Sequence, residues 1–426
     1  MGNQKLSLRG SDGKIYYGWK IVALGIILMT FAYSCVVSIV GCFVLPVTTS
    51  LDITIGAFTL FVTIMSAVSI IFLAIFSKIY SKNTTKKIMV TACVCGIIAF
   101  IGFGTSNSTM QFYIFSIPLG ICFAGLTTTP STLLASNWFG PAIRGRALGI
   151  IFGGNSFVVM ILIPIINAII QSAGWRIMYF ILAACLLCCI PLILTIVSWS
   201  PEEKGIKRMG DFSAEEAANA EATASLNDGI SFKDGLKRPS AWILFISGTL
   251  LVIASASVLS HGQPYMEMNG LSSTIASGCT SIMIGIALIT CILIGKIADK
   301  FGVGVSNIIT GLTFAACYLS LIFVPHGMIF VILYVVFYGL GCPAVNIVSP
   351  LIANHMFGDK EVGSFIGYIN MFISVGGAIS GIVVGQLFDK TGGYFVPFVV
   401  CIALLLTMML IRMVLCSKKY YYKNNM

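Results

Sequence analysis

The feature that most constrains this chain is a series of twelve long apolar runs with mostly short polar loops between them. About 20 apolar residues in a helix rise about 30 Å and span the hydrocarbon core of a bilayer. Within lipid each segment must pair its own backbone N–H and C=O groups, and a helix does so. The sequence therefore predicts an all-α membrane protein with helices over 20–46, 57–77, 88–106, 110–136, 147–171, 177–199, 241–261, 273–295, 304–324, 327–353, 363–387 and 394–415.

The scarcity of charge supports this prediction. Only 9% of the residues are charged, whereas a soluble domain carries about 25%. The net charge of +10 does not indicate nucleic acid, because the cations stand in short clusters between the apolar runs. We therefore expect the lipid bilayer, and no nucleic acid, as the large partner of this chain.

The same cations predict the orientation, because lysine and arginine collect on the cytoplasmic side of membrane proteins. With both termini inside, 23 of the 25 lysines and arginines fall on that side, and Arg176 and Lys390 fall outside. We expect a monomer in the inner or plasma membrane with cytoplasmic termini. Its predicted parts are a tail (1–19), a six-helix bundle (20–199), a linker (200–240), a second six-helix bundle (241–415) and a basic tail (416–426).

The sequence shows no pattern typical of an enzyme or a metal site. Nearly all of the 14 cysteines fall inside apolar runs, where cysteine packs as a small apolar residue. No Cys-x-x-Cys pair shares a polar loop with histidine, and the chain contains no Walker A loop. We therefore predict no metal, no cofactor and no enzymatic activity.

A polar turn recurs at half the chain length. Residues 295–302 read Gly-Lys-Ile-Ala-Asp-Lys-Phe-Gly, and 218 residues earlier 77–84 keep both lysines and the isoleucine but lack the glycines and the aspartate. Residues 135–140 and 353–358 match at the same offset. Two halves of six helices each are predicted, and they run parallel because an even number of spans returns the chain to its starting side.

The motifs resemble those of the major facilitator superfamily across essentially the whole chain. The turn 295–302 resembles the signature between the second and third helix of each half, 144–149 resemble the start of helix 5, and 174–176 resemble the start of helix 6. The resemblance implies the major facilitator fold, with twelve transmembrane helices in two parallel six-helix pseudo-repeats. It also implies a secondary active transporter that works by alternating access.

The resemblance also assigns a cytoplasmic gate. In the family, the aspartate of the turn latches neighbouring helix ends together in the outward-open state, and here that residue is Asp299. Because Ser81 takes its place in the first half, we expect that half to contribute less to gating. The gating residues implied in this way are Gly295, Asp299, Lys300, Gly302, Arg144 and Arg146.

A narrower similarity concerns the substrate. Residues 16–19 (Tyr-Tyr-Gly-Trp) and 137–139 (Asn-Trp-Phe) are similar to the branch of monocarboxylate transporters and oxalate–formate exchangers. That branch implies a small monocarboxylate with proton symport or exchange, but its basic residues are replaced here by Val37 and Cys291. An efflux carrier for drugs or metabolites and a non-transporting membrane sensor remain alternatives, and the sequence identifies neither substrate, coupling ion nor direction.

Neutral polar residues are the candidates for the substrate site, because no acid or base lies deep within the predicted spans. Each of them also has a structural alternative, a hydrogen bond within its own helix or between helices. His261, expected at the outer end of helix 7, is the proton-coupling candidate, because histidine titrates near neutral pH. The substrate-binding candidates are Tyr33, Ser38, Thr128, Asn155, Asn346, Tyr368 and Asn370.

Overall fold

The structure is a computed structural model that describes residues 15–210, 229–358, 361–417 and 420–421. The regular structure of these residues is helical, apart from two isolated β-bridges. Nine of the predicted membrane helices are continuous, as long apolar runs require in lipid. They are α4 (Ile55–Ile79), α5 (Thr85–Thr105), α8 (Pro141–Ala173), α9 (Trp175–Ile196), α12 (Pro239–Met268), α13 (Ser273–Phe301), α14 (Val303–Ile322), α17 (Val362–Thr391) and α18 (Phe395–Leu415).

The other three predicted helices exist but are interrupted, so the prediction of twelve membrane helices is confirmed and their expected continuity is wrong. In the tenth helix Pro343 contributes no backbone N–H, which favours a break. The first helix comprises α1 (Gly18–Leu28), the π-helical η1 (Met29–Ser34), α2 (Cys35–Val37) and α3 (Val40–Leu51). The fourth comprises α6 (Thr109–Leu126) and α7 (Thr128–Trp138), and the tenth comprises α15 (Met328–Gly341), the π-helical η4 (Ala344–Val348) and α16 (Ser349–Phe357).

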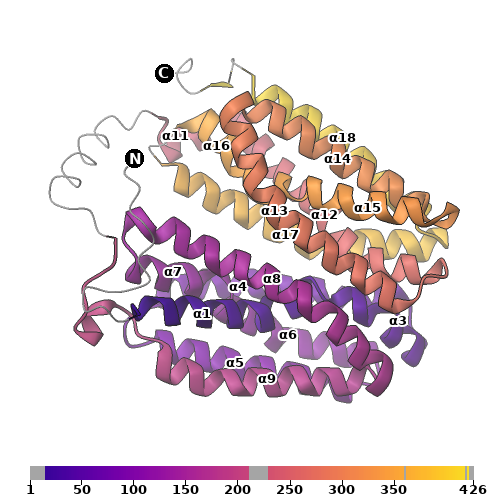
Figure 1. The fold of residues 1–426 in the computed structure, drawn as a ribbon, viewed down its shortest axis with the longest axis horizontal. Helices are drawn as coiled ribbons and strands as arrows, with labels where there is room; N and C mark the ends of the chain where they lie inside the picture. Colours follow the sequence, from indigo (N-terminus) through magenta and orange to yellow (C-terminus); the bar gives the residue numbers. More distant parts are fainter. Residues whose placement is uncertain (1–14, 211–228, 359–360, 418–419, 422–426) are drawn as a thin grey trace.

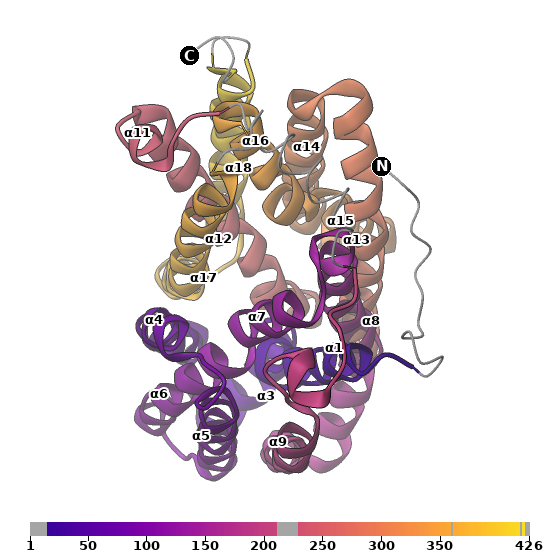
Figure 2. The same ribbon diagram turned by 90° about the vertical axis from the view of Figure 1, so that its left-hand side faces the viewer.

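The helices form two bundles that lie side by side (Figure 1). We call α1 to α9 the N-bundle and α12 to α18 the C-bundle; Figure 2 views both along their helices. One end of the molecule carries the linker helices η2 (Pro201–Lys204) and α11 (Phe232–Leu236), and we call it the linker face. The opposite end is the far face. The expected helical part of the linker, 214–224, lies outside the described residues.

The linker is hydrogen-bonded to both bundles at equivalent turns. The Gly140 amide donates to the Met209 carbonyl oxygen, and the Ile230 amide donates to the carbonyl oxygen of Phe357, both at 2.8 Å. Phe139, which forms a β-bridge with Met209, and Phe357 stand 218 residues apart, at matching places in the two halves. The repeat in the sequence is therefore also a repeat in how the linker is bound.

The turn 77–84, the incomplete copy of the motif, contacts the linker as well. Lys82 Nζ lies 3.7 Å from Glu203 Oε1. Burial opposes ionisation of Glu203, but hydrogen bonds from the Ser198 hydroxyl and the Trp199 amide, together with the Lys82 ammonium, lower the pKa of its carboxyl. The Lys82 side chain is 67% exposed, so this ion pair adds little stability.

The two bundles meet along two pairs of helices, α4 with α17 and α8 with α13 (Figure 2). On the first pair contact is closest towards the far face. The Thr54 hydroxyl donates to Asp389 Oδ2 at 2.8 Å, and a Cβ built on Gly385 would lie 2.8 Å from the Gly56 Cα atom. Gly377, two turns nearer the linker face, would reach only Val252 of its own bundle.

The second pair of helices shows the same divergence. The Ser273 hydroxyl lies 2.6 Å from Asn167 Oδ1 near the far face, and a Cβ on Gly153 would lie 3.4 Å from Leu288 midway along the helices. A Cβ on Gly149, one turn further towards the linker face, would have no described atom within 4 Å. The bundles are therefore joined at the far face and diverge towards the linker face.

The close contact at Gly385 gives a test of this packing. Gly385→Leu would force a side chain into the backbone of α4 and should lower stability by about 1–3 kcal/mol. Gly367→Leu is the matched control on α17, because a Cβ there would meet nothing within 4 Å. Thermal unfolding of the purified proteins should show a lower melting temperature for Gly385→Leu alone, and equal temperatures for both variants would contradict the packing.

Candidate functional site

The interruptions of the first and tenth helices approach each other between the bundles. The Tyr33 hydroxyl, in η1, is within electrostatic range of the Cys342 thiol, which stands between α15 and η4. The Tyr33 ring also packs 5.5 Å, centroid to centroid, from Phe123 of α6. A π-helical turn holds one extra residue and changes the direction of the side chains around it, and such turns are frequent at functional sites. Two of them facing one another mark a candidate site.

Asn155 extends this site on the N-bundle side. Its Oδ1 atom accepts hydrogen bonds from Thr30 Oγ1 at 3.2 Å and from Ser34 Oγ at 3.0 Å, and the residue is 6% exposed. Among the described residues, none accepts a hydrogen bond from its Nδ2 atom, and that nitrogen is not sealed from solvent. The amide is therefore oriented by two hydroxyls and retains donors for a ligand.

The structure distributes the other predicted substrate residues differently. Ser38 is half-buried between α2 and α3, Thr128 is exposed at the start of α7, and Asn370 is exposed on α17. The side chain of Asn346, in η4, is outside the described part of the structure. Tyr368 packs against Phe232 of the linker helix α11, with ring centroids 4.9 Å apart.

Of the predicted set, Tyr33 and Asn155 are thus the two that described contacts bring to the paired interruptions. Sequence reasoning did not place Thr30 in the site. Thr30 and Ser34 stand four residues apart, on one face of the first helix, and this spacing was the available signal.

His261 lies elsewhere than expected. Because α12 continues to Met268, His261 is two turns from the end of its helix and is fully buried, so the prediction of an outer-end position is wrong. Its Nδ1 atom lies 3.2 Å from the Tyr394 hydroxyl, and its Nε2 atom is buried without a hydrogen-bond partner. Its part in proton coupling stays a prediction.

A hydrogen-bonded network closes the space beyond His261. Gln263 Nε2 donates to Glu267 Oε1 at 2.9 Å, and the Ser273 hydroxyl lies 2.8 Å from the same oxygen. Gln263 also accepts from the Cys42 thiol of the N-bundle at 3.2 Å. With the Ser273–Asn167 contact, these groups connect both bundles on the far-face side of the site.

The predicted gate residues lie at the linker face. Gly302 ends α13 with a φ of +89°, a backbone conformation that favours glycine, and its amide donates to the Ala298 carbonyl oxygen. Lys300 is in the last turn of α13, and its Nζ atom lies 5.2 Å from the Phe301 ring centroid. Gly295 has open space around it, and Arg144 and Arg146 are exposed on α8.

Asp299 is also exposed, and within the described part of the chain no cation forms an ion pair with it. Because the linker face is open here, this arrangement does not test a latch of the opposite state, and the gating role stays a prediction.

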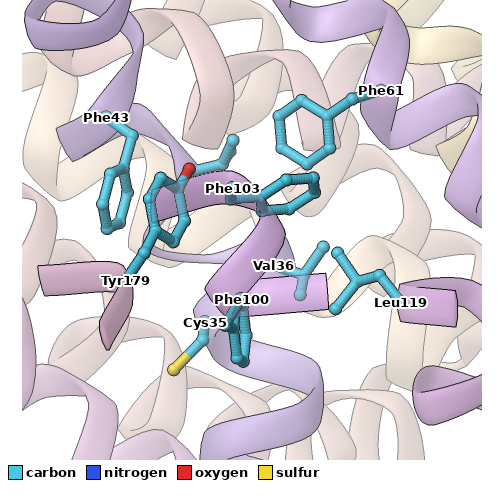
Figure 3. A pocket seen from close by; sticks show the side chains of 9 residues that line it. Cys35, Val36, Phe43, Phe61, Phe100, Phe103, Leu119 and Tyr179 are labelled. Carbon is cyan, nitrogen blue, oxygen red and sulfur yellow. The ribbon is translucent and has the colours of Figure 1, made fainter. Parts of the chain in front are cut away.

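One enclosed cavity can be excluded as the site. It lies inside the N-bundle, where the stacked rings of Phe43 and Tyr179 line one side and Phe61 and Phe103 line another (Figure 3). Its volume is about 10 Å³, which holds one water molecule at most. It is a packing defect among aromatic rings rather than a place for a solute.

The expectation that no charge lies deep within the spans is wrong for Arg412. This residue stands in the last turn of α18, but its side chain is 2% exposed. It donates to the Ser247 hydroxyl of α12 at 2.9 Å and to the Ala344 carbonyl oxygen of η4 at 3.3 Å. The sequence places it near a helix end, and only the tertiary structure shows that it points inward.

Comparisons with known proteins agree with this architecture. The chain is 25% identical over 366 residues to the "Putative tartrate transporter" of Agrobacterium vitis, and the match covers 79% of this chain and 77% of that protein.

Solved structures share the fold at low sequence identity. A bacterial homologue of the human lysosomal transporter Spinster, inward-facing and unoccupied, has a TM-score of 0.70 at 14% identity over 96% of this chain and 98% of that one. A D-xylose–proton symporter has a TM-score of 0.69 at 14% identity over 95% of this chain and 98% of that one. Residues 22–381 match the model of the Major Facilitator Superfamily. This chain therefore belongs to the major facilitator superfamily of multi-pass membrane transporters.

Proposed function

We propose that this protein is a secondary active transporter that moves a small organic metabolite, first of all a monocarboxylate, by alternating access. One observation carries the proposal: two interrupted helices from opposite bundles meet at Tyr33 and Cys342, between bundles joined at the far face. Interrupted helices that meet between repeats form the substrate site in many transporters. Rocking of one bundle against the other would then expose that site to each side in turn.

The distribution of cations supports an orientation. With the linker face in the cytoplasm, 23 of the 25 lysines and arginines of the sequence are cytoplasmic. The protein then lies in the inner or plasma membrane with both termini inside, acts as a monomer, and is in an inward-open state. The contacts of Thr54, Asn167, Gln263 and Glu267 form its closed outer gate.

The chemistry of the site supports a small polar substrate. The Asn155 amide and the Tyr33 hydroxyl can donate hydrogen bonds to a carboxylate. Apolar residues such as Phe123 leave room for a short carbon chain. The relative from Agrobacterium vitis is named for tartrate, whose carboxylates need donors of the same kind.

Transport itself is tested by counterflow in proteoliposomes. We expect a labelled short monocarboxylate (formate, acetate or lactate) to accumulate against an internal pool of the same anion, and glucose to be excluded. Liposomes without protein are the control. Binding of the anion without counterflow would point instead to a sensor.

Asn155 should determine how tightly substrate binds. Residue 373, at the matching place in the C-bundle, is isoleucine, so Asn155→Ile should fold. Loss of its hydrogen bonds should weaken half-saturating uptake about tenfold, which corresponds to about 1.4 kcal/mol. Ser156→Ala is the control, since the Ser156 hydroxyl bonds only to Phe152 of its own helix. Equal uptake by both variants would remove Asn155 from the site.

Asp299 should control the rate of conformational exchange. Asp299→Asn removes the charge of the predicted latch and should slow transport about tenfold at an unchanged half-saturating concentration and an unchanged level in the membrane. Initial rates over a range of substrate concentrations separate these two effects. Uptake at the wild-type rate would contradict a latch.

His261 should couple transport to protons. His261→Gln keeps hydrogen bonding to Tyr394 but cannot carry a proton. We expect accumulation driven by a pH gradient to be lost, while counterflow without a gradient continues. If His261→Gln still accumulates substrate against the gradient, the coupling group lies elsewhere.

A further inference from the structure

Arg412 is an uncompensated charge in the interior of the C-bundle. Its Nε and Nη1 atoms donate to two neutral acceptors, the Ser247 hydroxyl and the Ala344 carbonyl oxygen. Its Nη2 atom is buried and has no hydrogen-bond partner. The ion pairs recorded for the described residues, Lys82 with Glu203 and Lys237 with Asp234, both involve the linker. Hydroxyl and carbonyl groups orient a guanidinium but do not neutralise it, so burial of this charge is costly.

The architecture does not require a cation at this place. A glycine and an aromatic residue precede both α9 (174–175) and α18 (393–394), and counted from these pairs Arg412 corresponds to Ile193. Ile193 is fully buried in the N-bundle. The same fold is therefore built once with an apolar residue and once with an arginine, which indicates that the charge serves something other than packing.

The position of Arg412 connects it with the candidate site. Its Nη2 atom lies 4.0 Å from where a Cβ on Gly248 would stand. At the repeat offset of 218 residues, Gly248 matches Thr30, which orients Asn155 in the N-bundle. The other contact, Ala344, begins η4 and stands two residues from Cys342, which faces Tyr33. The guanidinium thus lies behind the part of the C-bundle that corresponds to the Asn155 side of the site.

We propose that Arg412 is the fixed positive charge of the substrate site and makes the carrier selective for organic anions. Acting through α12 and η4 in a medium of low dielectric constant, its charge attracts a carboxylate held by Tyr33 and Asn155. The absence of a side chain at Gly248 leaves the Nη2 side of the guanidinium uncovered by bulk. The inference rests on the proposed function and names its substrate class. It also supplies the cation missing at Val37 and Cys291.

The test compares Arg412→Ile, which installs the residue of the N-bundle, with Arg412→Lys, which keeps the charge. Purified protein is titrated with lactate, and its melting temperature is followed. Arg412→Ile should melt at or above the wild-type temperature without ligand, because an uncompensated buried charge is removed. Its apparent affinity for lactate should fall at least tenfold, and Arg412→Lys should retain most of the affinity. Wild-type affinity in Arg412→Ile would overturn the inference.

A second variant keeps the test decisive if Arg412→Ile fails to fold. Arg412→Gln can still donate to Ser247 or Ala344 and lacks only the charge, so it should fold and show the same loss of lactate affinity; retained affinity overturns the inference. Counterflow by the wild type separates the two proposals. Counterflow of a neutral solute alone overturns the role of Arg412 and leaves a transporter, whereas lactate binding that depends on Arg412 without counterflow supports the role and contradicts transport.

Discussion

The pairing of backbone hydrogen bonds inside lipid is the constraint on which this structure depends. An unpaired N–H or C=O group in hydrocarbon is costly, so a membrane helix can be interrupted only where protein or a water-filled cavity supplies new partners. The interrupted helices meet this condition. The Ser34 carbonyl oxygen accepts from the amides of Ser38 and Ile39, and the Ala344 carbonyl oxygen accepts from Arg412 and Ser349. The candidate site thus exists where the helices could afford to break.

The two halves share a scaffold but use it for different chemistry. In the N-bundle, Thr30 and Asn155 form a neutral hydrogen-bonded pair beside η1. In the C-bundle the matching residues are Gly248 and Ile373, and a buried guanidinium lies behind the glycine. Asymmetry of this kind suits a substrate with a charged end and a polar end, because each bundle then binds one of them.

The ends of the bundles are asymmetric too. At the far face, small residues such as Gly56 and Gly385 let backbones approach, and polar side chains complete the closure. At the linker face, the complete motif holds Asp299 free of described ion pairs, whereas Lys82 of the incomplete copy contacts Glu203 of the linker. Loss of the aspartate in the first half accompanies use of that turn to bind the linker.

The sequence by itself determined the fold and the number of membrane helices, because apolar length and backbone pairing leave a chain few other forms in lipid. It also identified Tyr33 and Asn155, since polar residues within apolar runs stand out. It could not locate the breaks in the first and fourth helices, whose residues are as apolar as their neighbours, nor the burial of His261, which depends on how far α12 extends. Arg412 is the clearest case. Distance from a helix end does not tell which way a long side chain points, and only the packing of α18 against α12 and η4 decided that its charge lies inside the protein.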